Sequence, residues 1–281
     1  MSDLHSINEA INKKAGRKLL PSIGVGLSLI ALVWFALSYQ RVIFAIVVAI
    51  AVILGVRELV RAFAARGIII SFNGLTLAAI GLSYAAWVGG VAGLAIATAI
   101  AFPLLLIRAL LQGPEGFVAK ATATTFGLLY LPFLAGFLIL LARPSTGFQR
   151  VMTFVVLVGC NDTFGYIVGV LLGKHPLVPK ISPKKTWEGL AGSLIFTMLG
   201  GALAFNYIMD MHWWIGIIVG LMIVFTATCG DLIESAMKRD MSLKDMGTLL
   251  PGHGGMLDRL DSVVLSAPAM WLALELVKRY L

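Results

Sequence analysis

The sequence is poor in charged residues. Only 13% of its 281 residues are Asp, Glu, Lys or Arg, whereas a soluble domain carries about a quarter. Hydrophobic residues make up 59% of the chain, and the mean hydropathy is +0.94. This composition excludes an ordinary soluble enzyme, a disordered protein and a basic nucleic-acid-binding domain. It predicts an all-α polytopic membrane helix bundle, in which the net charge of +8 belongs to loops beside the bilayer.

Patterns built on cysteine are also missing. The two cysteines, Cys160 and Cys229, lie inside apolar runs, so they predict packing and not a disulfide framework. The four histidines have no cysteine partners at the spacing of a zinc site. No internal repeat of fixed period is visible, which weakens a transporter interpretation, because many transporters are built from repeats.

What the chain does have is a series of long apolar runs after a polar N-terminal segment, residues 1–18. Because about 20 apolar residues cross a bilayer as a helix, the runs predict about nine transmembrane helices. The division of 72–110 into two spans rests on Gly89 and Gly90 alone. We expect residues 19–281 to form a single integral-membrane domain. The predicted spans are 20–38, 42–56, 72–88, 90–110, 121–141, 151–172, 190–209, 213–230 and 262–277.

The basic residues predict the orientation of these spans. With nine spans and a cytoplasmic N-terminus, 17 of the 22 lysines and arginines fall in cytoplasmic segments. Such an excess of positive charge is typical of cytoplasmic loops. The five on the other side are Arg41, Arg143, Arg150, Lys278 and Arg279.

Polar residues gather in two predicted cytoplasmic stretches of the C-terminal half, 173–189 and 230–261. In the later stretch, four polar residues are spaced i, i+3, i+4 and i+7, which places them on one face of a helix continuing out of the eighth span. The alternative is a set of solvated salt bridges at the membrane surface. The four residues are Asp231, Glu234, Ser235 and Lys238.

A second acidic face follows the Gly- and Pro-rich segment 251–255, which is unsuited to a helix. Asp258 and Asp261 lie three residues apart on the helix expected to start there. Carboxylates among several cations favour Mg²⁺, which binds one or two carboxylates and substrate phosphate oxygens. Free N–H groups of Gly254 and Gly255 could donate to phosphates as well. The cations suited to those phosphates are Lys238, Arg239, Lys244 and Arg259.

The earlier stretch carries basic and hydroxyl groups that suit a lipid or nucleotide phosphate. Its three prolines are expected to keep it extended. The bias toward positive charge in cytoplasmic loops explains its lysines equally well. The candidate substrate-binding residues are Ser182, Lys184, Lys185 and Thr186.

Asp162 is a further candidate, because it lies in the middle of the sixth span. An ionisable group at that depth costs about 3 kcal/mol on insertion scales and is a functional hypothesis by default. Gly165, Gly169 and Gly173 follow at +3, +7 and +11, so Asp162 shares the close-packing face of the helix. It should point into the bundle. A neutral Asp that hydrogen-bonds to another helix is the alternative.

The later stretch resembles the signature of the phosphatidate cytidylyltransferases, or CDP-diacylglycerol synthases. Every fixed position of their pattern is matched, and segments 230–235 and 182–189 look like this family too. The first 150 residues match only in hydropathy. One departure is that the family has an Ala-Tyr pair after the position of Asp162. The matching residues are Ser235, Lys238-Arg239, Lys244-Asp245, His253-Gly254-Gly255 and Asp258-Arg259-Leu260-Asp261.

The resemblance implies that phosphatidic acid and CTP give CDP-diacylglycerol and pyrophosphate for phospholipid synthesis. It also implies Mg²⁺ dependence, a second, monovalent cation such as K⁺ nearby, and a homodimer. Asp231 and Asp258 match the metal ligands of the family, and we add Glu234, Asp261 and Asp162 as candidates. The expected catalytic residues are Asp231, Lys238, Arg239, Lys244, His253 and Arg259.

Ser235, Gly254 and Gly255 are expected to bind substrate with the earlier stretch. His253 either donates to the leaving pyrophosphate or has a structural role in its loop. We expect a catalytic domain in a lipid bilayer, the bacterial inner membrane, with the active site in about 151–281 and no nucleic-acid partner. The alternative functions are a CTP-dependent lipid kinase of the dolichol- or phytol-kinase type and, with less support, a transporter.

Overall fold

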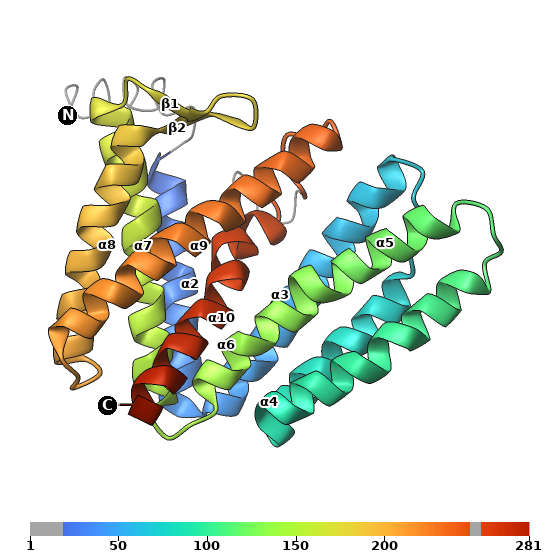
Figure 1. Ribbon diagram of the computed structural model, residues 1–281, viewed down its shortest axis with the longest axis horizontal. Helices are drawn as coiled ribbons and strands as arrows, with labels where there is room; N and C mark the ends of the chain where they lie inside the picture. Colours follow the sequence, from blue (N-terminus) through green and yellow to red (C-terminus); the bar gives the residue numbers. More distant parts are fainter. Residues whose placement is uncertain (1–18, 248–253, 281) are drawn as a thin grey trace.

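A computed structural model describes residues 19–247 and 254–280 of the chain. The described residues form a bundle of long helices with a small β-hairpin at one end (Figure 1). The helices are α2 (Leu19–Tyr39), α3 (Arg41–Ala65), α4 (Phe72–Leu110), α5 (Phe117–Leu128), η1 (Leu129–Phe133), α6 (Leu134–Ala142), α7 (Gly147–Leu172), α8 (Trp187–Tyr207), α9 (Trp213–Asp240) and α10 (Leu257–Tyr280), and the strands are β1 (Pro176–Val178) and β2 (Ser182–Thr186).

Seven helical segments of the described chain are long and apolar enough to cross a membrane. They are α3, α4, the continuous α5–η1–α6 segment, α7, α8, α9 and α10. The all-α polytopic bundle is therefore confirmed, with the β-hairpin as an unexpected addition. The count of about nine spans stays a prediction, because it counts α4 twice and includes α2.

Helix α4 doubles back at Gly90, as the pair of glycines predicts. Gly90 has φ 63° and ψ −146°, a conformation that is essentially restricted to glycine. Arg108 Nε donates to Ser71 Oγ over 2.6 Å, whereas a straight helix of this length would hold its ends about 58 Å apart. Figure 1 shows the two arms running side by side.

Helices α8, α9 and α10 are held together by close backbone approaches at glycines. Gly201 of α8 and Gly216 of α9 approach so closely that a Cβ on either would overlap the other's carbonyl. A Cβ on Gly230 of α9 would likewise overlap the carbonyl of Asp261 on α10. Small residues allow such approaches between membrane helices. The contact at Gly230 brings the two predicted acidic helix faces together.

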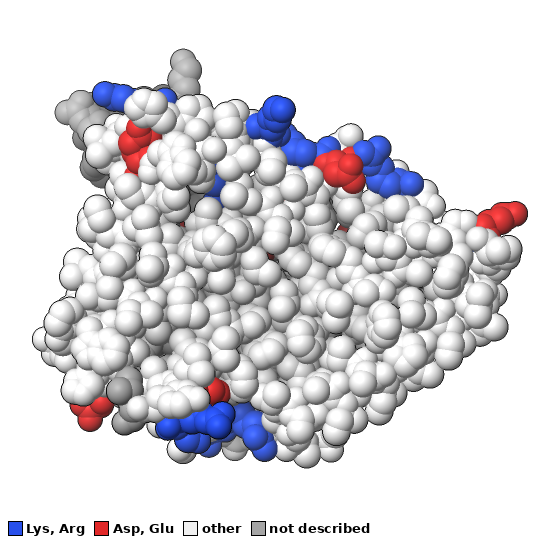
Figure 2. Space-filling model, viewed as in Figure 1, with Lys and Arg blue, Asp and Glu red and all other residues white. Residues whose placement is uncertain are grey.

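Charged side chains gather at the two ends of the bundle. Figure 2 shows lysines and arginines along both edges, with a broad band of uncharged residues between them on this face. Large apolar side chains such as Leu77 and Phe225 are 71% exposed. In water such a surface would be unfavourable, whereas lipid chains solvate it. The band is the part of the surface suited to a bilayer.

Candidate active site

The two polar stretches meet at one end of the bundle. The earlier stretch forms the antiparallel β1–β2 hairpin, which agrees with the extended conformation predicted from its prolines. Lys185 Nζ, on β2, lies 2.6 Å from Asp231 Oδ2 on α9. Arg239 Nε, farther along α9, donates to the carbonyl of Ile181 over 3.2 Å. The hairpin is therefore attached to α9 at two points.

Three carboxylates converge between α9 and α10. Asp231, Glu234 and Asp261 each offer an oxygen, and these oxygens all lie within 4.8 Å of one another. The helical extension of α9 to Asp240 confirms the face predicted for the first two. Hard oxygen ligands in this arrangement fit a divalent cation such as Mg²⁺.

Lys238 connects this cluster to Asp258. The Lys238 ammonium forms an ion pair with Glu234, which is fully buried, and lies 2.9 Å from Asp258 Oδ1. Asp258 Oδ2 also accepts backbone N–H groups from Gly255 at 2.6 Å and Met246 at 3.2 Å. The sequence predicts a free N–H on Gly255. In the structure this N–H instead donates a hydrogen bond to Asp258.

Other predicted residues take positions around the cluster. Asp162, on α7, is directed at α10, where Ser262 Oγ donates to its Oδ2 over 3.3 Å, although part of Asp162 stays exposed. Ser235 Oγ donates to Asp231 Oδ1 over 3.3 Å. Thr186 Oγ1 accepts from the Gly189 N–H over 3.1 Å and so caps the start of α8.

The remaining predicted residues differ in their exposure. Lys184 and Lys244 are exposed, and Ser182 is half-buried at the start of β2. Arg259 is half-buried on the first turn of α10, and Gly254 adopts a left-handed φ of 79° just before it. His253 lies outside the described residues.

Two site residues from the N-terminal half were missed by the sequence reasoning. Glu58 of α3 is buried and contacts the start of α10. Its signal was an acidic residue in an apolar helix, but the predicted span ended at residue 56. Tyr130 has a buried hydroxyl without a hydrogen-bond partner among the described residues, on which the carboxylates of the cluster act electrostatically. The sequence signal for Tyr130 was the nearby Pro132, a proline inside an apolar helix. In the structure this proline lies in the π-helical turn η1, a kind of turn that is frequent at functional sites.

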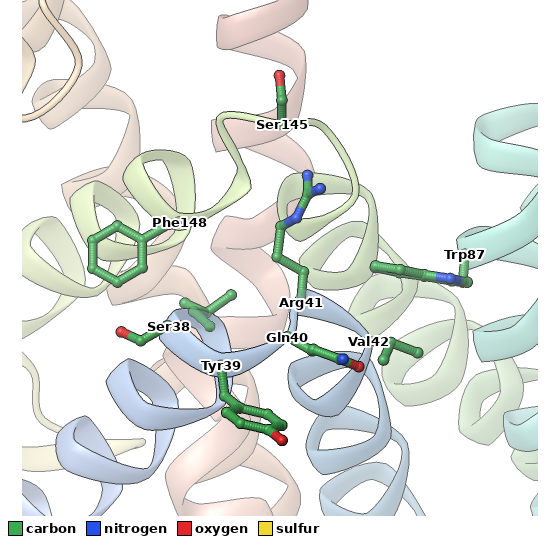
Figure 3. Close-up of a pocket in the computed structure, with 9 residues that line it drawn as sticks. Ser38, Tyr39, Gln40, Arg41, Val42, Trp87, Ser145 and Phe148 are labelled. Carbon is green, nitrogen blue, oxygen red and sulfur yellow. The ribbon is translucent and has the colours of Figure 1, made fainter.

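A pocket of about 470 Å³ lies at the other end of the bundle. Figure 3 shows the Arg41 side chain extending toward Ser145, with the rings of Tyr39, Trp87 and Phe148 around it. No carboxylate lines this pocket. It therefore lacks the acidic groups that a phosphate-bound metal requires.

Comparison with known proteins decides the family. The sequence profile of the cytidylyltransferase family matches residues 22–277. The chain belongs to this family. A phosphatidate cytidylyltransferase from Mycobacterium leprae is 37% identical over 280 residues, covering 94% of this chain and 90% of that protein. One from Mycobacterium tuberculosis (strain H37Rv) is 35% identical over 277 residues, covering 94% and 84%.

A shorter match to the phosphatidate cytidylyltransferase of Staphylococcus haemolyticus is 38% identical over 136 residues, covering 48% of this chain and 52% of that protein. The long matches extend the family likeness to the N-terminal half, where the signature is absent. The cytidylyltransferase family thus accounts for the helices that carry Glu58 and Tyr130 as well as for α9 and α10.

Proposed function

We propose that this chain transfers the cytidylyl group of CTP to phosphatidic acid, giving CDP-diacylglycerol and pyrophosphate. The observation that carries the proposal is the likeness to phosphatidate cytidylyltransferases over 94% of the chain. The meeting of lysines and carboxylates at one end of an apolar bundle supports it, because a lipid phosphate and a nucleotide must meet at the membrane surface.

The chemistry is a direct displacement. An oxygen of phosphatidic acid attacks the α-phosphorus of CTP, and the bond to the pyrophosphate oxygen breaks. A phosphate monoester has a second pKa of about 6, so the nucleophile is already largely anionic near neutral pH and needs no general base. Lys185, Lys238, Arg239, Lys244 and Arg259 supply positive charge against the charge that develops on the phosphates.

Asp231, Glu234 and Asp261 would hold Mg²⁺, since their oxygens converge. When bound, the ion would neutralise and orient the triphosphate. Asp258 remains a further candidate ligand, and Lys238 would keep it and Glu234 in place. Asp162 remains a candidate metal ligand, a second, monovalent cation such as K⁺ is part of the proposal, and His253 remains a candidate donor to pyrophosphate.

The proposal is tested with purified protein in detergent, supplied with CTP, Mg²⁺ and phosphatidic acid. We expect release of pyrophosphate and formation of CDP-diacylglycerol. Release of CDP with a phosphorylated lipid alcohol would instead identify a CTP-dependent lipid kinase. Flux across sealed vesicles without consumption of CTP would identify a transporter.

We also propose that the site end faces the cytoplasm of a bacterium, in its inner membrane, and that the protein is a homodimer. A single cysteine at Lys180, in the hairpin, should be protected from an impermeant maleimide in intact cells, and one at Ser145 should react. Cys160 and Cys229 are replaced by Ala first. The reverse labelling pattern would contradict this orientation, and a monomeric mass in detergent by light scattering would contradict the dimer.

A further inference from the structure

Glu58 is a buried acid of the N-terminal half that the mechanism above does not use. Only 2% of its surface is exposed. Its oxygens accept the backbone N–H groups of Met256 at 3.0 Å and Leu257 at 2.8 Å, at the start of α10. The first N–H groups of a helix have no partner within the helix. Helix α3 therefore supplies, from 199 residues away along the chain, the acceptor that α10 needs.

Backbone from both sides of segment 248–253 closes around this carboxylate. A Cβ on Gly247 or on Gly255 would overlap the Glu58 carboxylate group. A side chain at either position would therefore force the Glu58 carboxylate to move. The carboxylate also lies at the positive end of the α10 dipole, which stabilises its negative charge.

The turn that Glu58 holds is the turn that presents two acids of the site. Asp258 directly follows Leu257, and Asp261 lies one turn later in the cluster with Asp231. A shift of this turn would move both acids relative to α9. Misplacement of reacting groups by about 1 Å can cost about a hundredfold in rate.

We propose that Glu58 is a positioning residue for the reaction, which fixes the start of α10 from α3 and so sets the place of Asp258 and Asp261 opposite α9. This inference rests on the proposed function for the reaction that it supports. A glutamine cannot replace Glu58 fully, because an amide offers one acceptor oxygen to the two N–H donors.

The test is Glu58→Gln, compared with Glu275→Gln. Glu275 lies near the C-terminal end of α10, the helix whose start Glu58 contacts, and its Oε1 is 3.4 Å from Arg150 Nη1. In Glu58→Gln we expect kcat per folded molecule to fall about 10- to 100-fold, with KM for phosphatidic acid within about twofold. The rise in unfolding temperature given by CTP and Mg²⁺ without lipid should fall to less than about half. Glu275→Gln should keep both values.

A role in folding alone would lower the yield of folded protein but leave kcat and the CTP-induced temperature shift unchanged, and this result would overturn the proposal. Glu58→Asp retains the charge on a shorter side chain and should recover part of kcat. If the wild-type protein makes no CDP-diacylglycerol, the proposed function fails. The rise in unfolding temperature given by CTP and Mg²⁺, compared between wild type and Glu58→Gln, still tests the role of Glu58.

Gly247→Ala gives a second route should Glu58→Gln not fold. Its Cβ would displace the Glu58 carboxylate without changing a helix. We expect the same loss of kcat and of the CTP-induced shift. Gly81→Ala is the matched control, because a Cβ there meets nothing within 4 Å. Wild-type values in Gly247→Ala would overturn the proposal.

Discussion

The two ends of the bundle differ in what several of their basic side chains contact. At the end away from the site, arginines bind backbone carbonyls: Arg143 donates to Trp87 O at 2.8 Å and Val88 O at 3.0 Å, and Arg41 donates to Arg143 O at 3.0 Å. At the site end, Lys185 and Lys238 contact carboxylates instead. Arg41 and Arg143 thus complete chain reversals at one end, although Arg150 there pairs with Glu275, while Lys185 and Lys238 balance a cluster of acids at the other.

The difference separates structural from functional charge. The last carbonyls of a helix lack partners within it, and a guanidinium with five donors satisfies several at once. Clustered carboxylates, by contrast, repel one another and are costly to bury without a cation. Substitutions at the site end should therefore reduce activity, and substitutions at the other end should reduce stability.

The largest effect is expected for Asp231→Asn. An amide is a poor substitute for a carboxylate that faces a divalent cation, and the loss of a metal ligand costs several kcal/mol of barrier. We expect turnover below about 1% of wild type, since each 1.4 kcal/mol is about tenfold in rate. Pyrophosphate release measures it, and chromatography in detergent checks folding.

Asp210→Asn is the control for this substitution. Asp210 is exposed beyond the end of α8 and adopts a left-handed φ of 53°, which Asn accepts readily. It should retain wild-type turnover. More than about a tenth of wild-type activity in Asp231→Asn would contradict its assignment to the metal. Asp258→Asn is also expected to abolish turnover, through loss of a ligand or through release of Lys238.

Lys185→Met should have the next largest effect. It removes the 2.6 Å contact with Asp231 and a cation from the site. A hydrogen bond to a charged group is worth about 1.5–3 kcal/mol, which corresponds to a loss of about 10- to 100-fold in kcat/KM. Steady-state kinetics with CTP measure it. Lys180→Met, in the exposed turn of the same hairpin, should stay within about twofold, and equal losses in the two variants would contradict a specific role.

The helices and their polar ends could be predicted because each depends on local pattern. Apolar runs predicted the long helices, the pair of glycines predicted the reversal at Gly90, and the i, i+3 spacing predicted the acidic face of α9. The β1–β2 hairpin could not be predicted, because its pairing brings Pro176 opposite Thr186 without an alternating apolar pattern. Prolines indicated only that this stretch is extended.

The site was predicted in part. The helical spacing and the signature together placed Asp231, Glu234 and Asp261 in one region, and the structure brings their oxygens together. Glu58 could not be placed, because its contact with Leu257 joins residues 199 positions apart. Tertiary hydrogen bonds of this kind leave no periodic signal in the sequence. The Gly255 N–H is a local case, because Asp258, which accepts its hydrogen bond, lies only three residues later.

Gly90→Ala tests the other end of the bundle. An alanine at φ 63° and ψ −146° is strained by about 1–3 kcal/mol, and its Cβ would meet Arg143 Nη1. We expect a lower unfolding temperature in detergent and wild-type turnover per folded molecule. Gly89→Ala is the neighbouring control, since its Cβ meets nothing within 4 Å and its φ is not left-handed. Equal unfolding temperatures for the two variants would show that the reversal at Gly90 is absent in solution.

The smallest effect is expected for Arg143→Gln. The substitution removes the donors to Trp87 O and Val88 O, and each typical hydrogen bond contributes about 1 kcal/mol net. Because Arg143 is exposed and water can replace part of these bonds, we expect a decrease of a few degrees in unfolding temperature. Turnover per folded molecule should not change, since the site carboxylates lie at the other end of the bundle.

Lys278→Gln removes an exposed charge from the same end as Arg143 and controls for charge alone. Loss of turnover in Arg143→Gln at an unchanged unfolding temperature would contradict the division between the two ends.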